Sequence, residues 1–294
     1  MASTRDWLEG ARPRTLPLSI SPVIAGSAVA LAANELHPTR ALLALIVSVA
    51  MQLGVNYAND YSDGIRGTDA HRIGPKRLVG SGAATPKAVK TAAFTCFAIG
   101  CTAGLALVIL TQLWWIIAVG VAIVAAAWFY TAGPHPYGYH ALGELSVLIF
   151  FGLVAVGGTV LVQTPTFPLA ETLTVALAQG TGATAVLVVN NLRDIPSDTA
   201  AGKRTLAVLL ADAPTRHLFT TLTAISLAAS IAAALLITPW MLLCLAMVPF
   251  YYLANLPVIN GETGLSLVRS LKLVGLGQLT GAIGLLAGAA ISTL

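Results

Sequence analysis

The chain has 294 residues and a formal net charge of +4, and 56% of its residues are hydrophobic while only 10% are charged. Soluble domains carry about 25% charged residues, so this composition and a mean hydropathy of +0.82 exclude an ordinary soluble protein and predict one embedded in a lipid bilayer. The basic excess needs no nucleic-acid partner, because Lys and Arg beside membrane spans orient a chain in the bilayer.

Nine apolar segments are long enough to cross a bilayer as helices, which takes about 17 to 25 residues. In chain order they cover residues 16–33, 41–58, 91–111, 113–131, 142–163, 172–191, 217–237, 239–259 and 272–294. The sequence therefore predicts an all-α membrane protein, in which residues 1–294 form a single domain and nine transmembrane helices form one bundle.

The basic residues predict how this bundle is oriented. With nine spans and a cytoplasmic N-terminus, fifteen of the sixteen Lys and Arg residues fall in cytoplasmic segments, and Arg40 alone falls outside. Lys and Arg of short loops are found mainly on the cytoplasmic side. We therefore expect the N-terminus in the cytoplasm and the C-terminus outside.

Two long cytoplasmic loops, residues 59–90 and 192–216, hold most of the charge of the chain. The first motif reads NYANDYSDGIRGTD (56–69) and continues to GPKRLVGSG; the second reads NNLRDIPSDTAAG (190–202) and continues to KRTLAVLL. Each contains Asn, carboxylates, Gly and then a Lys-Arg pair, and the two follow spans that are four helices apart. Such an offset is typical of an internal repeat around a shared site.

The carboxylates of each motif are spaced to share one helix surface. Asp60 and Asp63 are three residues apart, and Asp194 and Asp198 are four apart. Four converging carboxylates are hard oxygen ligands that suit Mg2+, which commonly joins carboxylates to substrate phosphates. We therefore predict a Mg2+ site formed by these four aspartates and a diphosphate substrate. The residues expected to support the metal or the diphosphate are Asn56, Asn59, Asn190 and Asp69.

Basic side chains beside both motifs are expected to neutralise the diphosphate oxygens that the metal does not reach. They are Arg66, Lys76, Arg77, Arg193, Lys203 and Arg204. A charged loop that only caps a membrane helix is the plain alternative for either motif alone, and the matched spacing of the pair argues against it.

These two motifs in a nine-helix membrane protein resemble those of the UbiA-type superfamily of intramembrane prenyltransferases. The segments ARPRTLPLSISPVIAGSA (11–28) and YTAGPHPYGYHALGELSVLIFFGLVAVGGT (130–159) resemble one branch, the 1,4-dihydroxy-2-naphthoate polyprenyltransferases of menaquinone synthesis. Two departures separate the chain from the 4-hydroxybenzoate branch. Gly67 stands where that branch usually has an aspartate, and the loop after the fourth span lacks the expected lysine and offers His135 and His140.

The resemblance implies an enzyme of the bacterial plasma membrane whose active site faces the cytoplasm. Such enzymes bind a polyprenyl diphosphate through Mg2+, ionise it to an allylic cation and couple the cation to an aromatic acceptor. In this branch the acceptor is 1,4-dihydroxy-2-naphthoate, which loses its carboxylate as carbon dioxide and gives demethylmenaquinone.

An allylic cation needs a dry pocket with electron-rich walls, because water quenches it and aromatic faces stabilise positive charge. The resemblance favours Tyr130 and Tyr139 for this role. It also makes Arg12 a candidate to bind the carboxylate of the acceptor or the diphosphate. Glu144 has three open roles, which are acceptor binding, proton handling and simple complementation of a helix dipole.

A membrane transporter or divalent-metal channel is the alternative from another class, because internal duplication and membrane carboxylates suit either. The carboxylates lie where helices join loops on one face, rather than at mid-membrane, which favours the enzyme. Within the superfamily, another aromatic acceptor such as 4-hydroxybenzoate stays open, and so do the prenyl chain length and the oligomeric state.

Overall fold

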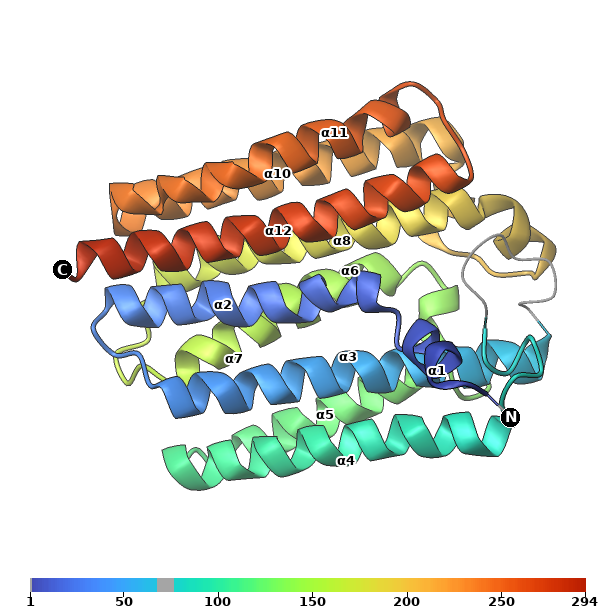
Figure 1. The fold of residues 1–294 in the computed structure, drawn as a ribbon, viewed down its shortest axis with the longest axis horizontal. Helices are drawn as coiled ribbons and strands as arrows, with labels where there is room; N and C mark the ends of the chain where they lie inside the picture. Colours follow the sequence, from blue (N-terminus) through green and yellow to red (C-terminus); the bar gives the residue numbers. More distant parts are fainter. Residues whose placement is uncertain (1, 68–76) are drawn as a thin grey trace.

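Long helices lie along one another in one elongated bundle (Figure 1). The computed structural model describes residues 2–67 and 77–294, so Asp69 and Lys76, two predicted site residues, lie outside the described residues. The helical elements are α1 Thr4–Gly10, η1 Pro13–Thr15, α2 Leu16–Ala32, α3 Pro38–Arg66, α4 Pro86–Thr111, α5 Ile116–Phe129, η2 Tyr137–Tyr139, α6 Gly143–Val147, the π-helix η3 Leu148–Val154, α7 Ala155–Leu161, α8 Leu169–Ala200, α9 Leu206–Leu210, α10 Asp212–Ile237, η4 Pro239–Met247, α11 Val248–Ile259 and α12 Leu265–Ser292.

The prediction of an all-α protein with nine apolar segments is confirmed for the described residues. Eight segments there are long and apolar enough to cross a membrane, and α5 is a shorter apolar helix of 14 residues. The fifth predicted span is divided into α6, η3 and α7, and the eighth into η4 and α11. The two termini lie at opposite ends of the bundle (Figure 1), as an odd number of crossings requires.

Two helices extend beyond the limits that hydropathy gave them. The first long loop was expected to begin at residue 59, but α3 continues to Arg66 and ends where Gly67 adopts the left-handed backbone, with φ of 70°. Likewise α8 continues to Ala200 through Pro196. Both motifs therefore lie on helix, because a helix that leaves the apolar layer keeps its own backbone hydrogen bonds when its side chains become polar.

The fifth span crosses α8 with direct backbone contact. A Cβ on Gly152 would lie 2.6 Å from the carbonyl oxygen of Ala176, and a Cβ on Gly180 would lie 2.8 Å from that of Leu148. Only glycine permits this approach. The span is wound as the π-helix η3 at this contact, and π-helical turns are often found at functional sites.

At the end of the bundle away from both motifs, Arg40 joins two helix ends. Its Nη1 donates to the carbonyl oxygen of Val162 at 3.1 Å, and its Nη2 donates to that of Leu110 at 3.3 Å. The last carbonyls of a helix have no partner within the helix. Arg40, the basic residue that the charge pattern leaves outside, therefore has a structural role.

Candidate functional site

A cavity of about 1560 Å³ extends along the inside of the bundle. Near Trp115 and Val162 its lining is apolar, and near the C-terminal half of α3 it becomes polar. The charged and amide residues at this end include Glu9, Arg12, Arg14, Asn56, Asn59, Arg77, Asn190 and Arg193. The cavity thus joins a long apolar chamber to a small end that is rich in cations and amides.

Four arginines and one glutamate line the polar end of the cavity. Arg12 adopts the left-handed backbone, with φ of 53°, and its buried Nη2 has no hydrogen-bond partner among the described residues. A buried, unused donor of a charged group is costly unless a ligand binds it. This end of the cavity is therefore suited to an anion.

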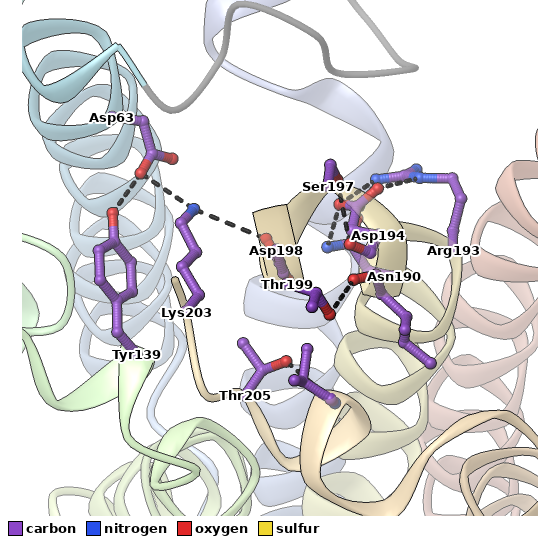
Figure 2. Close-up of polar contacts among 12 residues, drawn as sticks. Asp63, Tyr139, Asn190, Arg193, Asp194, Ser197, Asp198, Thr199, Lys203 and Thr205 are labelled. Carbon is purple, nitrogen blue, oxygen red and sulfur yellow. Dashed lines mark hydrogen bonds and ion pairs between the residues drawn. The ribbon is translucent and has the colours of Figure 1, made fainter. Parts of the chain in front are cut away.

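Asp63 and Asp198 are linked by one lysine, as Figure 2 shows. Nζ of Lys203 lies 3.3 Å from Oδ1 of Asp63 on α3 and 3.8 Å from Oδ1 of Asp198 on α8. The hydroxyl of Tyr139 also donates to Asp63, and Nζ of Lys203 lies 4.5 Å from the centre of the Tyr139 ring. Burial and the neighbouring Asp63 carboxylate raise the pKa of Tyr139, so its hydroxyl remains protonated and donates.

Asp194 is bound by its own neighbour, also drawn in Figure 2. Nε and Nη2 of Arg193 donate to its two oxygens, both at 2.7 Å. Nη2 also donates to Oδ1 of Asn190 at 2.9 Å, and Asn190 donates to Asp194 at 3.4 Å. This cluster lies at the edge of the cavity, which Asn190 and Arg193 line.

Asp60 faces a different partner, although it precedes Asp63 by less than one helical turn. Its two oxygens accept the backbone N–H groups of Leu78 and Val79, both at 2.9 Å. The structure therefore places it against the returning loop rather than beside Lys203.

The motif asparagines join neighbouring segments to α3. Nδ2 of Asn56 donates to the carbonyl oxygen of Ala11 at 2.9 Å and to Oγ1 of Thr15 at 3.2 Å. Oδ1 of Asn59 accepts the hydroxyl of Thr131 at 2.5 Å. Both asparagines also line the cavity, so they connect its polar end to the N-terminal segment and to the loop after α5.

Arg66 and Arg204, which the sequence predicts to bind the diphosphate, make contacts between loops. Arg66 donates to the carbonyl oxygens of Thr131 and Gly133 and lies over the ring of Tyr139, with Cζ 5.5 Å from its centre. The backbone N–H of Arg204 donates to the carbonyl oxygen of Tyr139 at 2.9 Å. Their contacts join the loop after α5 to both motifs.

Of the remaining candidates, Tyr130 is among the residues that line the cavity and Glu144 is not. The ring of Tyr130 packs edge-on against Tyr137, with ring centres 5.4 Å apart. Glu144 is buried and accepts a hydrogen bond from Nδ2 of Asn191 on α8 at 2.9 Å. It thus ties the start of the fifth span to α8.

Lys90, which was not predicted from the sequence as a site residue, lies beside aromatic rings at the edge of the cavity. Its Nζ lies 5.7, 6.0 and 5.8 Å from the ring centres of Tyr61, Phe94 and Trp128, and the last two rings line the cavity. The spacing of Lys90 and Phe94, four residues apart on a helix, is the signal that was present in the sequence.

The carboxylate oxygens at the ends of α3 and α8 are suited to bind a divalent cation between the two helices. Within residues 2–67 and 77–294, no three His, Cys, Asp or Glu side chains already form a metal-binding group. However, Lys203 places a positive charge between the carboxylates of Asp63 and Asp198, which come from the two helices. Hard oxygens around a position that already attracts a cation suit Mg2+.

Three comparisons relate this chain to known proteins. The profile described as the UbiA prenyltransferase family matches residues 19–264. A 1,4-dihydroxy-2-naphthoate octaprenyltransferase from Mycobacterium tuberculosis is 49% identical over 96% of this chain and 96% of its own length.

Two solved structures share the fold. The apo structure of a UbiA homolog from Aeropyrum pernix K1 has a TM-score of 0.71 and 17% identity, with 95% of this chain and 98% of that chain covered. A UbiA homolog from Archaeoglobus fulgidus bound to GPP and Mg2+ has a TM-score of 0.66 and 14% identity, with 96% and 99% covered.

Proposed function

The chain belongs to the UbiA prenyltransferase family, and we propose that it transfers a polyprenyl group from polyprenyl diphosphate to 1,4-dihydroxy-2-naphthoate. The acceptor loses its carboxylate as carbon dioxide, and the product is demethylmenaquinone, a precursor in menaquinone synthesis. The relative from M. tuberculosis, similar over almost the whole of both chains, supports this choice of acceptor. The acceptor 4-hydroxybenzoate is the alternative that an acceptor panel tests.

One observation carries the assignment: a single cavity joins an arginine-rich end to an apolar chamber of the same 1560 Å³ space. A prenyl diphosphate has the same division, with two phosphates at one end of a long hydrocarbon. The diphosphate lies among Arg12, Arg77 and Arg193, which donate charge-assisted hydrogen bonds to its oxygens. The prenyl tail lies in the chamber, where its burial is favourable at about 25 cal/mol per Å².

Asp63, Asp194 and Asp198 would hold Mg2+ between α3 and α8. When bound, the ion neutralises negative charge on the diphosphate leaving group. The A. fulgidus homolog, which has the same fold, was solved with GPP and Mg2+. Lys203, which lies 3.3 Å from Asp63, has three donors and can turn from the carboxylates to the diphosphate.

The protein holds the two substrates in position, stabilises the charges that develop and excludes water from the reaction. The arginines stabilise the charge that develops on the diphosphate as its bond to the first prenyl carbon breaks and the electron pair leaves with oxygen. The rings of Tyr130 and Trp128 line the cavity, exclude water and stabilise the allylic cation. The electron-rich acceptor ring then forms the new carbon–carbon bond.

The orientation and the repeat are part of this proposal. The C-terminal ends of α3 and α8 lie at the same end of the bundle as the N-terminus, and the C-terminus lies at the other end (Figure 1). Together with the basic loops, this supports an active site on the cytoplasmic face of the bacterial plasma membrane, with the C-terminus outside. Residues 1–294 form one domain, in which α3 and α8 are equivalent helices of an internal repeat.

The direct test uses the purified full chain with polyprenyl diphosphate and a panel of aromatic acceptors. We expect product and carbon dioxide from 1,4-dihydroxy-2-naphthoate, no product from 4-hydroxybenzoate, and loss of activity in EDTA that Mg2+ restores. Activity that survives complete removal of divalent metal would contradict the metal part. Divalent-metal flux into proteoliposomes without prenyl transfer would instead support the channel alternative.

A further inference from the structure

The loop of residues 77–84 folds back onto the end of α3, and Asp60 is the side chain that holds it. Its Oδ2 accepts the N–H of Leu78 and its Oδ1 accepts the N–H of Val79, both at 2.9 Å. Asp60 is 0% exposed. Two consecutive amides bound to the two oxygens of one buried carboxylate fix both the position and the direction of the loop backbone.

Leu78 and Val79, whose N–H groups Asp60 binds, each pack against a glycine of a neighbouring helix. Leu78 is 1% exposed, and a Cβ on Gly10 would lie 2.6 Å from its Cδ1. A Cβ on Gly64, one helical turn after Asp60, would lie 2.4 Å from Cβ of Val79. Carbon atoms do not approach so closely in a packed interior. The surfaces of α1 and α3 are therefore shaped to receive this loop.

Arg77 immediately precedes the two anchored amides and lines the polar end of the cavity, as Asn56 and Asn59 do. The loop is closed after it by the N–H of Ser81, which donates to the carbonyl oxygen of Arg77 at 3.1 Å. The backbone that carries Arg77 is thus held on one side by Asp60 and on the other by this turn.

We propose that Asp60 is a positioning residue, which holds the 77–84 loop so that Arg77 faces the diphosphate, and is not a ligand of the magnesium ion. The inference rests on the proposed function, and it separates two aspartates whose helical spacing makes them look equivalent. Asp63 contacts Tyr139 and Lys203, whereas both oxygens of Asp60 bind backbone of the loop.

Two variants disturb the loop in different ways. Asp60→Asn replaces one acceptor oxygen by an amide group that cannot accept an N–H. Gly64→Ala leaves the Asp60 carboxylate intact and pushes against Val79. We expect either variant to raise the KM for prenyl diphosphate about tenfold or more, the effect of one charge-assisted hydrogen bond, while kcat changes less. In an Arg77→Gln background, neither change should raise KM further.

Metal binding separates positioning from ligation. The probe is Mn2+, followed by its EPR signal on the full chain at saturating inorganic diphosphate. Asp60→Asn and Gly64→Ala should bind Mn2+ as the unmodified chain does, and Asp63→Asn should not. Gly275→Ala is the matched control, because its added Cβ meets only ordinary contacts at 3.6 to 3.9 Å.

The inference is overturned if Asp60→Asn loses Mn2+ as Asp63→Asn does while Gly64→Ala keeps the KM of the unmodified chain. The Tm of Asp60→Asn shows whether that variant folds, and if it does not, the inference is tested with Gly64→Ala alone. An unchanged KM in Gly64→Ala then overturns the inference. A raised KM supports it, provided that Gly64→Ala raises KM no further in the Arg77→Gln background. An unmodified chain that neither binds Mn2+ nor transfers prenyl groups contradicts the proposed function instead.

Discussion

Lys203 and Asp63 form an ion pair between two distant parts of the chain, with Nζ 3.3 Å from Oδ1. The side chains are only 14% and 7% exposed, so water weakens their attraction little. The same ammonium lies 3.8 Å from Asp198. One lysine therefore compensates the carboxylates of both α3 and α8 and holds the two helix ends together.

Replacing this lysine should make the stability of the protein depend on metal. Lys203→Met leaves Asp63 and Asp198 buried without their shared cation, which is strongly unfavourable. We expect its Tm in EDTA to fall by several degrees and to recover when Mg2+ is added, whereas the unmodified chain should respond less. Lys272→Met, an exposed lysine of α12, is the control, and an equal loss of Tm in that variant would contradict the prediction.

Removing the Asp63 carboxylate should abolish the metal site. Asp63→Asn is expected to lower kcat/KM roughly 100-fold or more, since even residues that only support a metal ligand cost 10- to 100-fold. Asp212→Asn is the matched control, because its side chain is 59% exposed and pairs with Arg216 four residues on. Rates for the two variants at a series of Mg2+ concentrations give the comparison, and similar rates would contradict the assignment of Asp63.

The hydroxyl and the ring of Tyr139 should contribute separately. Tyr139→Phe removes the donor to Asp63, and we expect kcat/KM to fall about tenfold, the effect of one hydrogen bond to a charged group. Tyr139→Leu also removes the aromatic face beside Lys203, which is worth about 0.5 to 2 kcal/mol more. Tyr252→Phe, at a residue that is 64% exposed, controls for the substitution. Equal rates in the Phe and Leu variants would show that the ring has no role.

Glu144 should prove structural, because its carboxylate binds Asn191 and Glu144 is not among the residues that line the cavity. Glu144→Gln keeps an oxygen that can accept the Asn191 amide, so both kcat and Tm should stay close to those of the unmodified chain. Glu144→Leu leaves that buried amide without its acceptor, which costs about 1 to 3 kcal/mol of stability. A large loss of kcat in Glu144→Gln, with unchanged Tm, would instead favour proton handling.

Hydropathy predicted the spans well because the bilayer demands apolar surface over a fixed length. It could not predict the ends of α3 and α8, since the helix continues into polar sequence up to Arg66 and Ala200. Nor could it predict the π-helix η3, whose position is set by contact between the fifth span and α8. These features depend on packing between segments that are distant in sequence.

The sequence predicted which residues belong to the candidate site, but not which residues their side chains contact. Charge and spacing singled out Asn190, Arg193 and Arg77, and all three line the cavity. They treated Asp60 and Asp63 alike, because three-residue spacing puts both on one helix surface. Their difference arises from the return of the 77–84 loop, and spacing within one helix contains no information about that loop.

Helix α5 forms one apolar wall of the chamber. Every residue of α5 is partly or fully exposed, and Val121 and Trp128 are among those that line the cavity. A prenyl tail in the chamber supplies the apolar contacts that a neighbouring helix would supply elsewhere. If prenyl diphosphate binds as proposed, its hydrocarbon adds apolar contacts to α5 and becomes part of the hydrophobic core around the chamber.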